Sequence, residues 1–256
     1  MAYEVIVLGG SGTFPAPGAA CSGYLFRFGE TALWVDCGPG SFANLQRHIK
    51  PSELSAIVLT HTHLDHIVDL YPFLYQMRYG PEATEPAGFP VYAPAGSAEF
   101  IGRLASHEGP TGDPTFGGYL SFLEINATLI ATVGDFELRF CRTKHPIETY
   151  AVRATANSQA VAYTADTGPD MGVTNFCWGA NLIICEASAQ KPSKELAQLH
   201  MTAADAGELA TRACTAQLLL THLVPGLDPK VSQQQAAREF RGEIGVASDN
   251  LRVLVY

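Results

Sequence analysis

Four potential metal ligands lie within six residues, directly after a short apolar segment. The apolar segment covers residues 56–59, and the ligands that follow it are His61, His63, Asp65 and His66. Packing in a hydrophobic core does not explain such a cluster. Imidazole nitrogens and carboxylate oxygens are ligands that Zn²⁺ and similar dications accept, and residues that leave the end of one strand can converge on one point. The pattern therefore favours a metal site over the alternative, a histidine-rich surface loop.

Three later polar residues repeat this arrangement, because each comes just after an apolar segment. His145 follows residues 138–141, Asp166 follows residues 161–164, and His222 follows residues 218–221. Strand ends on one edge of a sheet share a crevice. Taken singly, each residue could belong to a turn or be a half-buried polar side chain. Together with the first cluster, all three are predicted to be metal ligands.

Short β-type segments alternate with helical ones in both halves of the chain. The predicted strands are residues 3–8, 22–28, 32–35, 56–59, 129–131, 137–142, 161–164, 182–186, 217–221 and 251–255, and the predicted helices are residues 41–49, 67–77, 203–214 and 232–240. Residues 80–90 and 109–118, rich in Gly and Pro, are predicted loops that could border a substrate cleft. Two packed sheets with helices outside would give a four-layer α/β fold, and a 47% hydrophobic composition allows a single domain over residues 1–256.

Two further polar residues lie in the second half of the chain. His200 comes just before Thr202, which forms a capping-box pattern with Asp205 and so starts a helix. The free N–H groups at a helix entry favour an anion. Glu186 ends a predicted strand. On the residues alone, an exposed histidine near a helix cap and an ordinary strand-end carboxylate remain open as alternatives.

The seven predicted ligands, in their order along the chain, resemble the metal-binding motif of the metallo-β-lactamase superfamily. The resemblance covers nearly the whole chain and implies that family's αββα sandwich, with two mixed sheets and helices outside. It also implies two divalent metal ions, one held by His61, His63 and His145, the other by Asp65, His66 and His222, with Asp166 as the bridge. The bridging residue here is an aspartate, as in the phosphodiesterase, ribonuclease and glyoxalase branches, and not a cysteine, as in the true β-lactamases. The resemblance therefore argues against hydrolysis of β-lactam antibiotics.

His200 and Glu186 resemble a pair found in the ribonuclease Z and cyclic-nucleotide phosphodiesterase branch. There the histidine contacts the scissile phosphate and donates a proton to the leaving oxygen, and the glutamate orients that histidine. The glycine-rich turn at residues 9–13 is similar to a turn of the same branch whose backbone lines the metal pocket. It is not a dinucleotide-binding turn, because Pro15 and Pro17 exclude the helix which that motif requires. Asp36 resembles a hydrogen-bond acceptor for a metal-binding histidine, with a turn carboxylate as the alternative.

These residues predict a metal-dependent phosphodiesterase. Two metal ions can generate a hydroxide near neutral pH and stabilise a phosphoryl transition state. In this hypothesis Asp65 positions or deprotonates the hydroxide, and His200 protonates the leaving oxygen. The expected substrate is a small cyclic nucleotide such as 3′,5′-cyclic AMP. The alternatives are a ribonuclease Z-like tRNA 3′ endonuclease, a thioester or lactone hydrolase, and a metal-dependent binding module without catalysis. Zinc is the expected metal, with manganese or iron as alternatives.

The charge of the chain favours a small anionic substrate over a long nucleic acid. The formal net charge is −9, from 16 Lys and Arg against 25 Asp and Glu, whereas proteins that neutralise many backbone phosphates are usually basic. Enzymes of the ribonuclease Z type normally carry a basic arm that grips tRNA. Residues 80–90 and 107–118 contain no Lys or Arg. The sequence therefore lacks the most recognisable tRNA-binding feature of that branch.

Cysteine usage and hydropathy predict a cytoplasmic protein without membrane contact. The six cysteines form no C-x-x-C pair and are predicted to be buried, reduced thiols. No apolar run approaches the roughly 18 residues that span a bilayer, and the N-terminus lacks the features of a signal peptide. The family resemblance suggests a homodimer. Phe73, Tyr75, Met77 and Tyr79 could serve its interface, although a core role is the favoured interpretation for them.

Overall fold

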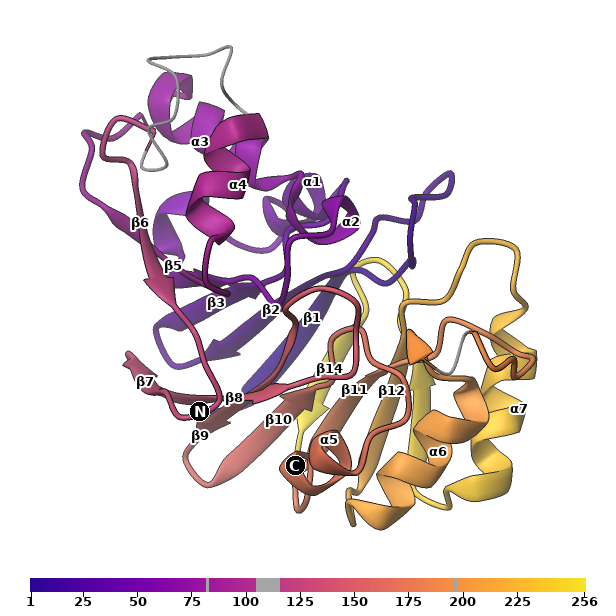
Figure 1. Cartoon of the computed structure of the whole chain (residues 1–256). Coiled ribbons are helices and arrows are strands. Elements are labelled where there is room, and N and C mark those ends of the chain that lie inside the picture. The colour runs from indigo at the N-terminus through magenta and orange to yellow at the C-terminus, as the bar shows by residue number, and fades with distance from the viewer. Residues whose placement is uncertain (82, 105–115, 196–197) are drawn as a thin grey trace.

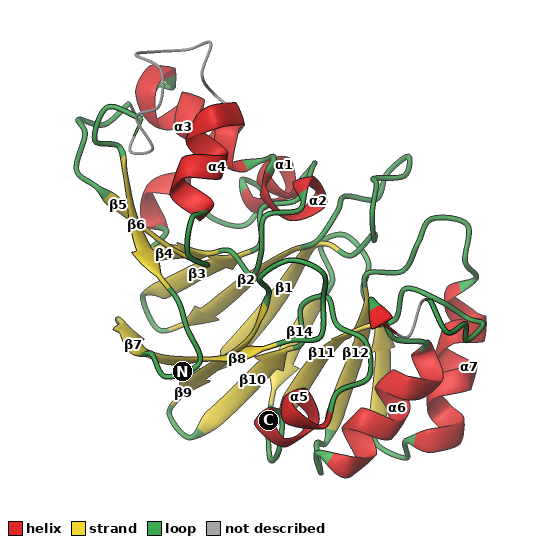
Figure 2. Cartoon of the chain, viewed as in Figure 1, coloured by secondary structure: helices red, strands yellow, loops and turns green. Residues whose placement is uncertain are grey.

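Two seven-stranded sheets face each other, and helices cover the outer face of each (Figure 1). This computed structural model describes residues 1–81, 83–104, 116–195 and 198–256. Figure 2 shows the helices segregated to the two outer sides and the strands between them. The predicted four-layer α/β sandwich with two mixed sheets is therefore confirmed.

The first sheet combines strands from the start of the chain with one from its C-terminal part. Its order is β14 (Arg252–Val255), β1 (Tyr3–Gly9), β2 (Gly23–Phe28), β3 (Thr31–Val35), β4 (Ala56–Val58), β5 (Phe89–Ala93) and β6 (Leu120–Glu124). Strands β14 to β3 pair antiparallel, and β3 to β6 pair parallel. The sheet is therefore mixed, with its parallel half at the β6 edge.

The second sheet repeats this division. Its order is β13 (Glu243–Val246), β12 (Gln217–Thr221), β11 (Leu182–Glu186), β10 (Gln159–Tyr163), β9 (Tyr150–Ala156), β8 (Phe136–Arg142) and β7 (Ile130–Val133). Strands β7 to β10 pair antiparallel, and β10 to β13 pair parallel. The carboxyl ends of β10, β11 and β12 consequently meet at one edge, where three predicted site residues leave the sheet.

Three hydrophobic layers separate the four layers of secondary structure. Tyr3 and Phe136 meet between the sheets, with ring centroids 5.2 Å apart. The first sheet packs on α1 (Ser41–Leu45), α2 (Leu64–Ile67), α3 (Leu70–Tyr79) and α4 (Ser97–Leu104), near the 3-10 helix η1 (Pro51–Glu53). The second packs on α5 (Met171–Phe176), α6 (Ala203–Arg212) and α7 (Pro229–Glu239). Alternate residues of one strand face opposite layers, as Leu33 and Trp34 do, because side chains alternate across a sheet.

Several predicted boundaries differ from the structure. The helix predicted over residues 67–77 corresponds to α3, which begins at Leu70 and so places Pro72 in its first turn, where no intrahelical N–H is needed; Ile67 is the last residue of α2. The helix predicted over residues 41–49 ends at Leu45. The loop predicted over residues 80–90 includes the start of β5, and its residues 84 and 87–90 line a hollow with Phe73 and Met77 rather than with any predicted ligand. Most of the loop predicted over residues 109–118 lies outside the described residues.

Burial corrects two of the expectations about single side chains. Phe73 and Met77 pack in the core as predicted, but Tyr75 and Tyr79 are exposed. All six cysteines are free thiols, of which Cys141 is half-buried and Cys214 is exposed, so the prediction of burial holds for the other four only. Within the described ranges, none of the helices has the length and apolar character needed to cross a bilayer.

Trp34 offers a test of the layer between the first sheet and its helices. Its buried ring stacks on Phe42 at 5.8 Å and meets Phe73 edge-on at 5.7 Å. Truncation leaves a cavity, so we expect Trp34→Ala to lower the free energy of unfolding by about 3–5 kcal/mol. Urea unfolding measures this change. Trp178→Ala is the matched control, because that ring is 66% exposed and should change stability little; equal losses in both variants would contradict the layered core.

Candidate metal centre

The predicted ligands lie where several strands end near the gap between the two sheets. Strand β4 leads into the segment that carries His61 and His63, and α2 carries Asp65 and His66. The other three come from the second sheet: His145 follows β8, Asp166 follows β10, and His222 follows β12. His222 adopts a left-handed backbone conformation with φ of 55°, which is uncommon for a residue other than glycine and often marks a functional site.

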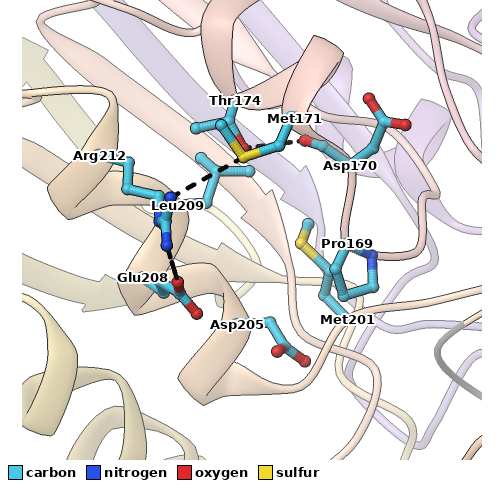
Figure 3. A pocket seen from close by; sticks show the side chains of 9 residues that line it. All are labelled: Pro169, Asp170, Met171, Thr174, Met201, Asp205, Glu208, Leu209 and Arg212. Carbon is cyan, nitrogen blue, oxygen red and sulfur yellow. Dashed lines mark hydrogen bonds and ion pairs between the residues drawn. The ribbon is translucent and has the colours of Figure 1, made fainter.

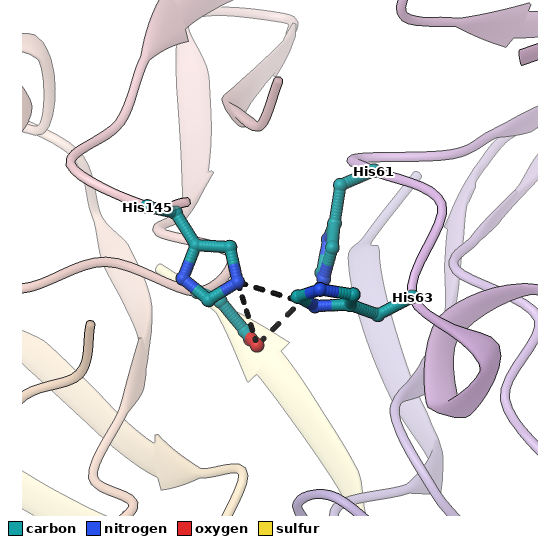
Figure 4. A group of neighbouring side chains, drawn as sticks. His61, His63 and His145 are labelled. Carbon is teal, nitrogen blue, oxygen red and sulfur yellow. Dashed lines mark hydrogen bonds and ion pairs between the residues drawn. The ribbon is translucent and has the colours of Figure 1, made fainter. Parts of the chain in front are cut away.

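One group of side chains surrounds Oδ2 of Asp166. His61, His63, His145 and Asp166 offer ligand atoms that lie within 4.8 Å of one another. Figure 4 shows the three imidazoles turned toward one another. His145 Nε2 is 3.2 Å from His63 Nδ1, and Asp166 Oδ2 is 3.7 Å from His61 Nε2 and 3.9 Å from His145 Nε2. This is the set that the sequence assigned to one metal ion.

The second group surrounds the other oxygen of the same carboxylate. Asp65, His66 and His222 likewise offer ligand atoms within 4.8 Å of one another. Asp166 Oδ1 lies 3.4 Å from His66 Nε2 and 3.5 Å from His222 Nε2. Asp166 therefore presents one oxygen to each group, which is the position expected of a bridging ligand. The structure brings all seven predicted residues together in the predicted division.

The contacts of His66 test whether this pocket fits a cation. His66 Nδ1 is 2.8 Å from Asp36 Oδ2, and a carboxylate only accepts, so this nitrogen is the donor. In the neutral ring, Nε2 then carries a lone pair that faces Asp166 Oδ1 at 3.4 Å and Asp65 Oδ2 at 3.6 Å. At such distances these atoms need a positive charge between them, either a proton on Nε2 or a metal ion. The donor set therefore fits divalent metal ions.

Unpaired buried atoms and shifted pKa values also indicate a site for a cation. His61 Nε2 and Asp166 Oδ1 are buried without a hydrogen-bond partner in the described part of the chain. Burial lowers the pKa of His66, but the charges of Asp166 and Asp36 outweigh this effect and raise it to about 10. Burial raises the pKa of Asp166, but the surrounding histidines, His222 and His66 foremost, hold it far below its usual range. The pocket therefore attracts positive charge.

Asp36 and the glycine-rich turn support the centre from behind, as expected. The buried Asp36 carboxylate accepts hydrogen bonds from His66 Nδ1, from the Thr60 N–H at 2.9 Å and from the Tyr163 hydroxyl at 3.1 Å. In the turn, the Thr13 N–H donates to Asp65 Oδ2 at 2.8 Å. A Cβ atom at Gly12 would come within 2.7 Å of His222 Nδ1, which explains the glycine at this position.

His200 and Glu186 lie together beside the pocket. His200 Nδ1 is 3.0 Å from Glu186 Oε1, and the His200 ring is 5.5 Å from that of His222 and 5.4 Å from that of His145. Glu186 is fully buried, whereas the His200 side chain is 20% exposed. Burial lowers the pKa of His200, but the hydrogen bond and charge of Glu186 outweigh it and raise the pKa to about 9.

Two hydroxyl groups next to the ligands were missed on sequence. The Thr60 hydroxyl is 2.9 Å from His61 Nδ1, and the Ser188 hydroxyl is 2.8 Å from His222 Nδ1. Thr60 is adjacent to a ligand in the sequence, so a search for hydroxyl residues beside the histidines would have found it. Ser188 is 34 residues from His222, and only the parallel pairing of β11 with β12 brings them together.

A hollow of about 180 Å³ between α5 and α6 is separate from this centre (Figure 3). Asp170, Glu208 and Arg212 contribute to its lining, and Arg212 Nη2 pairs with Glu208 Oε1 at 2.7 Å. Its acidic groups already act within the fold, because Asp170 caps α5 by accepting from the Val173 N–H. None of the seven predicted ligands lines this hollow, so we place the functional site at the histidine and aspartate cluster.

Comparison with known proteins agrees with this geometry. The family described as "Beta-lactamase superfamily domain" matches residues 31–223. "Probable metallo-hydrolase YhfI" of Bacillus subtilis is 31% identical over 246 residues, which cover 95% of this chain and 96% of that protein. The crystal structure of YhfI has a TM-score of 0.87 and 29% sequence identity, covering 99% of this chain and 100% of the other. A "Ribonuclease Z" of Mycobacterium bovis is 29% identical over 285 residues, covering 99% of this chain and 98% of that protein. The chain belongs to the beta-lactamase superfamily and is a metal-dependent hydrolase.

Proposed function

We propose that this chain is a dinuclear phosphodiesterase that hydrolyses a small cyclic nucleotide, such as 3′,5′-cyclic AMP. The observation that carries the proposal is the pair of His200 and Glu186 beside the seven ligands. Hydrolysis of a phosphodiester needs a proton for the oxygen that leaves. A histidine held by a buried carboxylate, and partly exposed at the edge of the pocket, is suited to supply it.

The two groups of side chains would hold one divalent metal ion each. His61, His63 and His145 would bind the first and Asp65, His66 and His222 the second, with Asp166 shared between them. When bound, a pair of such ions lowers the pKa of a water molecule and neutralises charge that develops on a phosphate. Imidazole and carboxylate ligands favour zinc here, with manganese or iron as alternatives.

The other residues of the site position the substrate and move protons. Burial raises the pKa of Asp65, but the hydrogen bond that it accepts from His222 and the charge of His66 hold the pKa well below its ordinary range. Asp65 therefore stays ionised and can orient an attacking water molecule. His200, with its raised pKa, keeps a proton at neutral pH and can pass it to the leaving oxygen. Glu186 fixes the ring of His200 through Nδ1.

The acidity of the chain supports a small substrate. A net charge of −9 disfavours binding along an RNA backbone, and residues 80–90 supply no basic arm.

A tRNA 3′ endonuclease is the second candidate, favoured by the similarity to a ribonuclease Z over nearly the full length of both chains. A thioester or lactone hydrolase is the third, and the pair of His200 and Glu186 argues against it, because this pair resembles one found in the phosphodiesterase branch. We retain a homodimer and a cytoplasmic location as parts of the proposal.

Substitutions at Asp166 and His200 should separate metal binding from proton transfer. Asp166→Ala removes the shared ligand, so we expect loss of metal at both positions and loss of turnover. His200→Ala should keep the metal content and lower kcat by about 10²–10⁴-fold, the usual contribution of a general acid. Metal analysis of the purified proteins and kinetics measure the two effects. His48→Ala, a histidine whose Nε2 contacts Asn250 away from the centre, is the control. Equal metal loss in the Asp166 and His200 variants would contradict the assigned roles.

The substrate can be tested directly with metal-loaded protein. We expect hydrolysis of 3′,5′-cyclic AMP and no cleavage of a precursor tRNA, because residues 80–90 and 107–118 contain no Lys or Arg that could form a tRNA-binding arm. Product release is measured for both substrates, with Asp166→Ala as the inactive control. Cleavage of tRNA alone would instead establish the endonuclease. Turnover of neither, with activity on a thioester or lactone, would reject phosphoryl chemistry.

A further inference from the structure

Ser188 lies at the junction of the metal pocket and the proton donor. It follows β11 by two residues and is buried. Its Oγ is 2.8 Å from Glu186 Oε2, 2.8 Å from His222 Nδ1 and 3.3 Å from His200 Nδ1. The segment is held in place by a bridge between Ala189 and Thr202, at the entry of α6. One hydroxyl thus contacts a predicted metal ligand, a predicted acid and the carboxylate that orients it.

Counting donors and acceptors fixes the direction of these hydrogen bonds. Glu186 only accepts, and it receives the Thr167 N–H at 2.6 Å, the Met201 N–H at 3.2 Å and the His200 Nδ1–H at 3.0 Å. The single hydroxyl proton of Ser188 is donated to the same carboxylate. The Ser188 oxygen is then an acceptor, so His222 Nδ1 must be the donor. Nε2 of His222, which lies 3.3 Å from Asp65 Oδ2 and 3.5 Å from Asp166 Oδ1, is then the ring nitrogen that can bind a metal ion.

We infer that Ser188 is a positioning residue that links His222 to the Glu186–His200 pair. Its hydroxyl selects the His222 tautomer that can bind a metal ion, and it holds the carboxylate that orients His200. The Glu186 carboxylate therefore aligns both rings, that of His200 directly and that of His222 through the Ser188 hydroxyl. The part concerning His200 rests on the proposed function, whereas the part concerning His222 does not.

The opposite side of the centre contains the same order of groups. The Thr60 hydroxyl donates to Asp36 Oδ2 at 2.9 Å and lies 2.9 Å from His61 Nδ1. Carboxylate, hydroxyl and histidine thus follow one another twice, on two different sheets. In both places the hydroxyl oxygen can accept from the imidazole N–H, and a buried imidazole N–H without an acceptor is costly. The repeat therefore supports the same positioning role for both hydroxyl groups. In both cases the nitrogen on the far side of the ring is left free for a cation.

Zinc affinity tests the link to His222 without any substrate. Competition with a chromophoric chelator gives the dissociation constant of Zn²⁺ for the wild type, Ser188→Ala and Ser188→Thr. We expect Ser188→Ala to weaken zinc binding about 10–100-fold, as loss of a supporting hydrogen bond to a ligand usually does, and Ser188→Thr to restore most of it. Ser97→Ala is the matched control, because Ser97 is buried and its Oγ has no partner among the described residues. Zinc affinity in Ser188→Ala equal to that in Ser97→Ala would overturn the inference, whether or not the threonine variant folds.

A kinetic cycle tests the link to His200. With saturating Zn²⁺ and bis(p-nitrophenyl) phosphate as the probe, we expect Ser188→Ala to lower kcat about tenfold with little change in KM. In a His200→Ala background the same substitution should leave kcat unchanged, since the ring it helps to align is gone. Equal loss of kcat in both backgrounds would overturn the coupling to His200. If the wild type does not hydrolyse the probe, the proposed function fails, while the zinc series still decides the role of Ser188 at His222.

Discussion

The buried carboxylate of Asp36 is the interaction on which the arrangement of the site depends. Asp36 comes from the end of β3 in the first sheet, and it accepts a hydrogen bond from Tyr163 of β10 in the second. It also binds Thr60 and His66, which belong to the segment that carries the first ligands. A buried carboxylate must have donors around it. Asp36 thus ties the segment that carries the first ligands to a strand of the second sheet, and this link helps to fix the position of the two sheets in which the metal pocket assembles.

A second buried carboxylate applies the same constraint on the other side. Glu186 is fully enclosed and accepts from two backbone N–H groups, a hydroxyl and His200. His61, His66, His200 and His222 are thus each hydrogen-bonded through Nδ1 before any cation is bound. His145 follows the same rule with a backbone carbonyl, since its Nδ1 donates to Leu199 at 3.1 Å. Ligands held in this way lose little freedom on binding, which favours affinity and a fixed geometry.

The sequence predicted which candidate ligands lie together better than it predicted the elements between them. Each ligand follows an apolar strand, and this local signal does not depend on knowing the partners of the strand. The strand β5 was missed because Pro90 argues against a central strand, and β9 because its alanines have low strand propensity. The contacts of Ser188 were beyond prediction for another reason. They require the register in which Glu186 lies opposite Thr221, and a single sequence does not reveal that register.

The pairing of β1 with β14 has a consequence for how the protein is made. Tyr3 lies opposite Val255, and the Val7 N–H bonds to the Leu251 carbonyl, so β1 can complete this pairing only after β14, far along the chain, has been synthesised. Translation proceeds at about 5–20 residues per second, and over that interval one edge of β1 exposes unpaired N–H and C=O groups. The N-terminal half therefore cannot complete its sheet while the rest is being synthesised. Nascent chains are open to pairing with one another during this time, and a chaperone that shields β1 would act on this stage of biogenesis.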